Sequence, residues 1–238
     1  MEYEIKGGSF PIVECTLKKG EKMISESGAL CYMDHSIKME ATSNGGLNKV
    51  VGRLFTNEKL FQNSYTAEED GAKVSFGTCV PGSIVAVELD GTNSLVCQKS
   101  AFLASYGDVE LSTFFNKKIG VGLFGGEGFI MQKIVGKGIV FLEIDGSIIN
   151  FELKEGEKKI ISTGHLVCMD ETCAIDIESV GGLKNMFLGG EGLFHTIVTG
   201  PGKVVIQTMP LAKFAASLKP FMPTSHDSSS SHSSSHNN

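Results

Sequence analysis

The chain has 238 residues, of which 41% are apolar and 20% charged, a composition that excludes disorder for most of its length. Its formal net charge is -6. This acidic total argues against a protein whose main affinity comes from neutralising phosphates, because such binding needs an excess of lysine and arginine. Nucleic acid is therefore not an expected partner.

Apolar runs are short throughout the sequence. The run at residues 139–142 ends far below the roughly 20 residues that a membrane-spanning helix needs. Residues 1–6 have neither the basic start and apolar block of a signal peptide nor the arginine-rich pattern of a transit peptide. We expect a cytoplasmic protein without a transmembrane segment, for which peripheral membrane contact remains open.

A stretch near the N-terminus is repeated in the C-terminal part of the chain. Residues 17–34 align without a gap with residues 153–170, and ten of the eighteen positions are identical. Leu30 and Leu166 fall on matched apolar positions, so we expect equivalent core sites for them.

A middle copy has weaker identity but the same spacing. Residues 83–89 align with 147–153, and at the same offset Gly125–Gly128 align with Gly189–Gly192. The sequence thus predicts one domain over residues 1–222, made of three units at about residues 11–82, 83–146 and 147–210.

Each copy carries the signals of strands and turns. Residues 12–17 alternate between apolar and polar types, as a half-buried strand does. Glycines punctuate the segments, as at Gly20, at Gly156 and in a predicted turn at Gly136–Gly138. We predict an all-β, pseudo-threefold sandwich or prism, with residues 1–10 adding an edge strand.

The C-terminal region changes character after Pro210. Leu211, Phe214, Ala215 and Leu218 follow the spacing of one helical stripe, which predicts a short closing helix at about residues 211–218. Residues 223–238 are rich in serine and histidine and are expected to be disordered.

Several motifs together resemble one known family. They are the Gly181-Gly182-Leu183 segment, the Gly-Gly-Glu-Gly-Leu-Phe segment at Gly189–Phe194, and the turn at Gly200-Pro201-Gly202. The chain resembles a bacterial-type member of the mitochondrial-biogenesis "altered inheritance of mitochondria" family, with a fold similar to the tryptophan-RNA-binding attenuation protein. The resemblance implies a pseudo-threefold β-sandwich and no defined chemistry, cofactor or site.

Glu58, Glu127 and Glu191 occupy corresponding positions in the three copies. Threefold symmetry could bring their carboxylates together as a metal site. The alternative, which we favour, is that each carboxylate caps backbone N–H groups in its own glycine-rich loop. Such a loop needs at least one glycine with positive φ, and Gly128 and Gly192 are the candidates.

Two further patterns suggest a cofactor or a metal, but the first lacks the structural context and the second the spacing that would support it. Residues 120–125 match Gly-x-Gly-x-x-Gly but lack the strand before and the helix after that dinucleotide binding needs. His165, Cys168 and Cys173 are possible zinc ligands that fit no strong zinc pattern. We expect no cofactor, and we expect the six cysteines to be buried reduced thiols.

Apolar side chains also project from the glycine-rich connections. They are Leu123, Phe124, Met186, Phe187 and Leu188. Exposed, they would form a contact surface for a protein or a membrane, and folded back they would plug the end of the sandwich.

The leading functional hypothesis is a non-enzymatic binding or scaffold protein. It would present these symmetry-related loops to a protein partner, including a second copy of itself, or to a membrane surface. A small-molecule or metal-dependent enzyme with its site among the loops is the alternative, although no nucleophile–base spacing supports catalysis. RNA binding is a second alternative, which rests on the fold resemblance alone.

Overall fold

The computed structural model describes residues 1–43, 61–117, 128–179 and 194–222. Within these residues the chain forms antiparallel β-sheets and one short α-helix, which confirms the all-β prediction. The strands are β1 (Glu2–Lys6), β2 (Ile12–Leu17), β3 (Lys22–Glu26), β4 (Leu30–Met33), β5 (Ile37–Ser43), β6 (Phe61–Ala67), β7 (Ala72–Gly77), β8 (Gly82–Asp90), β9 (Leu95–Gln98), β10 (Phe102–Lys117), β11 (Phe129–Asp145), β12 (Ile148–Leu153), β13 (Lys158–Ser162), β14 (Leu166–Met169), β15 (Ala174–Ser179), β16 (Phe194–Thr199) and β17 (Gly202–Gln207). The helices are α2 (Leu211–Leu218) and the short 3-10 turns η1 (Lys99–Ala101) and η2 (Lys219–Phe221).

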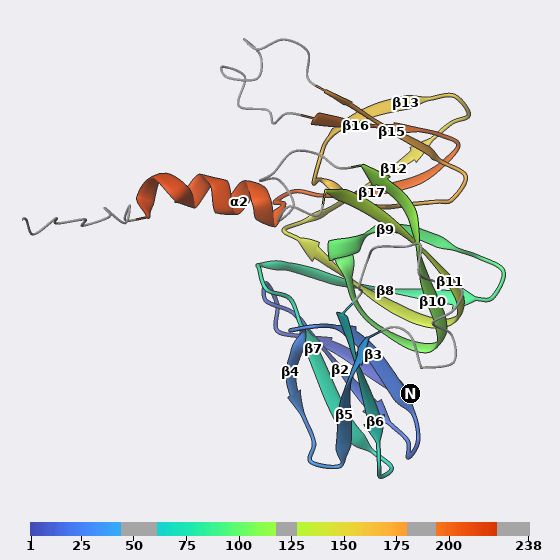
Figure 1. Ribbon diagram of the computed structural model, residues 1–238, viewed down its shortest axis with the longest axis vertical. Helices are drawn as coiled ribbons and strands as arrows, with labels where there is room; N and C mark the ends of the chain where they lie inside the picture. The colour runs from blue at the N-terminus through green and yellow to red at the C-terminus, as the bar shows by residue number, and fades with distance from the viewer. Residues whose placement is uncertain (44–60, 118–127, 180–193, 223–238) are drawn as a thin grey trace, which may run out of the picture.

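The strands form three sheets, of which the second extends along the long axis of the molecule, from β5 near one end to β12 near the other (Figure 1). The first sheet has the order β1-β2-β7-β4, with β1 at its edge as predicted for the N-terminal residues. The large second sheet has the order β12-β17-β14-β9-β11-β10-β3-β6-β5, with β8 also paired to β11, and the third has the order β13-β16-β15. Strands β1–β7 lie at one end of the molecule and β12–β17 at the other (Figure 1).

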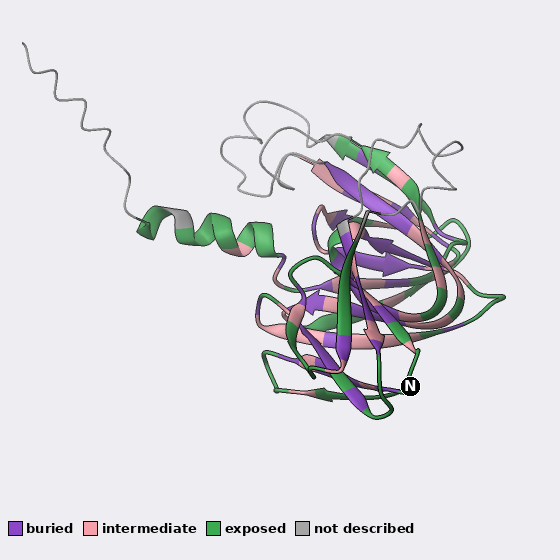
Figure 2. Ribbon diagram, turned by 60° about the horizontal axis from the view of Figure 1, so that its bottom comes forward, coloured by how far each residue is buried: buried purple, intermediate pink, exposed green. Residues whose placement is uncertain are grey.

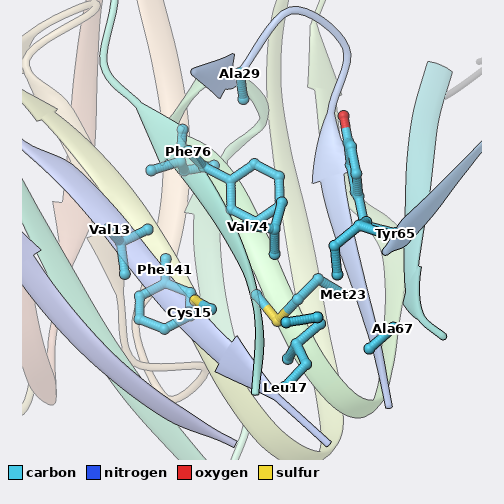
Figure 3. Packing of buried hydrophobic residues seen from close by; sticks show 14 of the residues in the cluster. Val13, Cys15, Leu17, Met23, Ala29, Tyr65, Ala67, Val74, Phe76 and Phe141 are labelled. Atoms are coloured by element: carbon cyan, nitrogen blue, oxygen red, sulfur yellow. The ribbon is translucent and has the colours of Figure 1, made fainter. Parts of the chain in front are cut away.

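Alternation of side chains places the core between facing sheets. In β2, Val13, Cys15 and Leu17 are buried, while the residues between them are more exposed. They meet side chains from the opposite sheet in the first of three buried clusters, which Figure 3 shows. Within it the rings of Tyr65 and Phe76 pack edge to face, with centroids 5.1 Å apart.

Matched local contacts occur in the first and third segments of the chain. The Glu21 carboxylate accepts the Lys18 N–H at 2.9 Å, and the Glu157 carboxylate accepts the Lys154 N–H at 3.0 Å. Strand β4 pairs with β7 through a bulge just after Leu30, as β14 pairs with β17 through a bulge just after Leu166. The division into three symmetric units stays a prediction.

The turn predicted at Gly136–Gly138 is wrong. Strand β11 runs without interruption from Phe129 to Asp145 and pairs with β10 through this region. Gly136 has φ +123°, and an added Cβ there would lie 2.0 Å from the Asp108 carbonyl oxygen. These glycines therefore permit a bend and a close approach of two long strands rather than a chain reversal.

Helix α2 has the predicted bounds but does not close the sandwich. None of its residues is buried, and it projects sideways from the body (Figures 1 and 2). Periodicity indicates which face of a helix is apolar, but it does not determine what covers that face.

The two matched leucines differ in burial, which corrects the expectation of equivalent core sites. Leu166 is fully buried, whereas Leu30 packs only partly against the first cluster. We predict that Leu166→Ala lowers the free energy of unfolding by about 2–5 kcal/mol, and that Leu30→Ala costs clearly less, about 1 kcal/mol. Urea titration of both variants checks this, and equal losses would contradict the difference in packing.

Candidate functional site

Most of the loop residues singled out from the sequence lie outside the described residues. This applies to Glu58, Glu127, Glu191, Leu123, Phe124, Met186, Phe187, Leu188 and residues 120–125. Their roles stay predictions. Gly128 is described and has φ 91°, which confirms the positive φ expected in its loop.

The three possible zinc ligands lie in different surroundings. His165 Nδ1 is 2.7 Å from the carbonyl oxygen of Gln207, which can only accept, so this nitrogen carries the proton. Cys168 and Cys173 belong to separate buried clusters, and the Cys173 thiol donates to the Pro201 carbonyl. No group of three or more His, Cys, Asp or Glu side chains is placed to hold a metal among the residues that the structure describes.

All six cysteines are free thiols, but the expectation that all are buried is wrong. Cys31 and Cys79 are exposed, and the other four are buried. Burial raises the pKa of the Cys168 thiol to about 12. The thiolate is the reactive form of cysteine, so this thiol is unreactive near neutral pH.

A network centred on Glu14 joins all four strands of the first sheet. The Glu14 carboxylate accepts hydrogen bonds from Lys6 at 2.9 Å, from Lys73 at 3.0 Å and from the Tyr32 hydroxyl. These donors, Tyr32 first among them, lower the pKa of Glu14 to about 2. The network holds β4 in place at the edge of its sheet.

A second acidic group lies where β11 ends and helix α2 begins. Burial, with a smaller contribution from the Asp145 and Glu26 carboxylates, raises the pKa of Glu143 to about 8. Burial also raises the pKa of Asp145, whose carboxylate accepts the Leu211 N–H at 2.8 Å. Asp145 thus anchors the first residue of α2 to the body.

The Glu143 carboxyl and the nearby Cys79 thiol both have raised pKa values, so both hold their protons more tightly than usual. Glu143 keeps its proton near neutral pH, and the pKa of the neighbouring Cys79 thiol is raised by partial desolvation and then by the carboxyls of Glu143, Glu26 and Asp145. A raised pKa weakens a thiol as a nucleophile. The arrangement therefore supports anchoring of the helix better than nucleophilic catalysis.

An apolar cavity of about 200 Å³ is lined by residues of strands β8, β9, β11, β12, β14 and β17. Its lining includes Val85, Leu142, Ile148 and Met169. Asp170 also lines it but accepts the Lys203 N–H at 2.7 Å. Sites for small molecules usually enclose roughly 300–1,000 Å³ and contain converging polar groups.

The C-terminal segment carries the most exposed large apolar side chain of the described chain, together with several other exposed ones. Phe221 is 85% exposed and Met222 65%, and Leu211 and Leu218 on the stripe of α2 are also exposed. Figure 2 shows the helix as an exposed element that stands away from the sheets. None of the described helices is long and apolar enough to cross a membrane.

Sequence reasoning identified this stripe but missed the acidic groups. Glu14 is one of several acids on strands, and no spacing marks its partners on three other strands. The same holds for Glu143, because its pKa depends on segments that are distant in the sequence.

The fold and these surfaces define an all-β protein of antiparallel sheets, from which a helix with an exposed apolar stripe projects. The family model described as "Mitochondrial biogenesis AIM24" matches residues 3–209, so the chain belongs to this family, as predicted. The likeness to the tryptophan-RNA-binding attenuation protein stays a prediction.

Two similar proteins come from Streptococcus pyogenes. An uncharacterised protein of serotype M6 is 32% identical over 225 residues, which cover 91% of this chain and 88% of that protein. The crystal structure of a structural-genomics target is similar with a TM-score of 0.75 and 24% identity, over 93% of this chain and 99% of that one. The latter likeness supports the fold alone.

The raised pKa of Glu143 predicts a pH-dependent stability. In the unfolded chain this carboxyl ionises near its ordinary pKa of 4.5, whereas the folded chain retains the proton up to about pH 8. Its contribution to stability is therefore full below pH 4.5 and is lost as the pH rises through 8. We predict that Glu143→Gln removes this part of the decline in thermal unfolding temperature between pH 4.5 and 8.

Glu88→Gln is the matched control, because Glu88 is an exposed carboxyl on the neighbouring strand β8. It should leave the pH profile unchanged. A Glu143→Gln profile parallel to that of the wild type would contradict the assigned pKa.

Proposed function

We propose that the chain is a non-enzymatic scaffold protein that binds a protein partner through apolar surface left uncovered by its own fold. The observation that carries this proposal is the exposed stripe of α2, continued by Phe221 and Met222. An apolar side chain gains free energy when it leaves water, and uncovered apolar patches mark contact surfaces.

The anchoring of α2 supports the same function. Asp145 accepts the N–H of Leu211, and the side chain of Gln207 in turn accepts the N–H of Asp145 at 2.9 Å. The N-terminal end of α2 is thus fixed to the body, while its apolar stripe remains exposed to solvent. Leu211, Phe214 and Leu218 have the i, i+3, i+7 spacing with which a helix enters the groove of a partner.

We favour a protein partner over a membrane surface. The helix proper contains a single lysine, Lys213, and the chain as a whole is acidic. Helices that lie on anionic membranes are usually rich in basic residues on the polar face. The predicted contribution of the glycine-rich loops and a cytoplasmic location belong to the same proposal.

The double variant Leu218→Glu/Phe221→Glu tests the proposal. Tagged full-length chain captures proteins from a lysate of its own host, and mass spectrometry quantifies them. At least one protein held by the wild type should fall by roughly tenfold or more with the variant, because two central apolar anchors are lost.

Ala212→Glu/Ala216→Glu is the matched control, since it adds the same charge to the other, exposed face of α2. It should retain the captured protein. Equal capture by all three chains contradicts the proposal. Flotation of the wild type with phosphatidylglycerol vesicles, lost in the Leu218→Glu/Phe221→Glu variant, would identify a membrane as the partner instead.

A further inference from the structure

Two edge-to-edge strand junctions join the segments of the chain. At the first, β10 pairs antiparallel with β3; at the second, β14 pairs antiparallel with β9. The pairs of the first junction are Ala104–Ser25, Ser105–Ile24 and Tyr106–Met23. The pairs of the second are Cys168–Cys97 and Met169–Val96.

The two junctions have the same register. Ser83 aligns with Ser147 at an offset of 64 residues, Leu17 aligns with Leu153 at 136, and the difference of 72 relates the first copy to the second. The offset of 64 converts the β10 residues of the first junction into the β14 residues of the second, and the offset of 72 converts the β3 residues into those of β9. One mode of contact therefore occurs twice.

Half of this junction is left open at each end of the molecule. By the same offsets β4 corresponds to β14, but among the described residues β4 pairs only with β7. Likewise β13 corresponds to β9, but within the same described ranges it pairs only with β16. The free side of β4 corresponds to the side of β14 that pairs with β9. The free side of β13 corresponds to the side of β9 that pairs with β14.

Burial distinguishes the open halves from the filled ones. All four residues of β9 and all four of β14 are buried. In the open strands, by contrast, Tyr32 is 43% exposed, Met33 37% and Ile160 65%. The strand positions that the internal junctions remove from water thus remain in water at the two ends.

The composition of β4 indicates a strand that pairs with a further strand on its free side. Edge strands are commonly protected from pairing by charged residues. Among the strands that pair on one side only in the described part of the chain, β4, with the sequence Leu-Cys-Tyr-Met, alone has no charged residue. The other such strands are β1, β5, β8, β12, β13 and β15.

The two open edges cannot meet within this chain as folded. Strand β13 lies at one end of the long axis, and β4 lies in the bundle at the other end (Figure 1). We propose that β13 of one copy pairs antiparallel with β4 of a second copy, in the register of the two internal junctions. The expected pairs are Tyr32–Ile161, Met33–Ile160 and Asp34–Lys159.

This register adds favourable contacts beyond backbone hydrogen bonds. It places the exposed side chains of Met33 and Ile160 opposite each other, and it pairs the opposite charges of Asp34 and Lys159. The contact is head to tail, so it leads to a closed ring or an open filament. It uses neither α2 nor its stripe, and it therefore goes beyond the proposed function and can fail independently of it.

Single-end variants test the contact. Ile160→Glu blocks β13 and Met33→Glu blocks β4, and Ile5→Glu on the exposed edge strand β1 is the matched control. Native mass spectrometry and sedimentation velocity measure the mass across a dilution series, and thermal unfolding confirms that each variant is folded. The wild type and Ile5→Glu should form multiples of 25.4 kDa, whereas each blocked variant alone should be monomeric.

A mixture of the two blocked variants gives the decisive readout. Each retains the edge that the other lacks, so the mixture should form a dimer of one Ile160→Glu chain and one Met33→Glu chain, and nothing larger. Pairing of β4 with β4, or of β13 with β13, between two chains could not produce this result. A monomeric wild type, assembly that survives both substitutions, or no dimer in the mixture would overturn the proposal.

Discussion

Antiparallel pairing of β3 with β10 and of β9 with β14 is the contact on which the rest of this structure depends. Without these contacts, the strands that they join would expose rows of unpaired backbone N–H and C=O groups. The contacts also merge the strand groups β12-β17-β14, β9-β11-β10 and β3-β6-β5 into one large sheet. Because both contacts add strands to the same large sheet, the molecule extends along one axis, and in the described part of the chain an open edge remains at each end. The elongated body and its unfilled ends thus have a common cause.

The uncovered surfaces lie in different places, which has consequences for binding. The open edges are at the two ends of the molecule, whereas α2 projects from its side (Figure 1). Head-to-tail assembly would therefore leave the apolar stripe free and repeat it at regular intervals. Repeated weak sites on one assembly bind a multivalent partner far more tightly than a single site does. In this arrangement the proposed scaffold role and the proposed self-association reinforce each other.

Local features of the fold were predictable from sequence, whereas features that depend on distant contacts were not. Alternation identified strand β2, and helical spacing with Pro210 identified the bounds of α2. The bend in β11 was mistaken for a turn, because glycine permits a reversal and a close strand approach equally well. The raised pKa of Glu143 and the four-strand network of Glu14 arise from residues brought together only by folding. Of the candidate sites, the stripe of α2 was visible in the sequence, but its exposure follows only from the way the helix leaves the body.

Amide hydrogen exchange tests the central claim most directly, because it reports which backbone N–H groups gain hydrogen bonds on association. The full chain would be compared at low and high concentration. If the ends form the third copy of the internal junction, protection should increase with concentration in β4 (Leu30–Met33) and β13 (Lys158–Ser162), while the edge strands β1 and β12 stay unchanged. Protection that does not depend on concentration in β4 and β13, or that increases only at other edges, would contradict the claim.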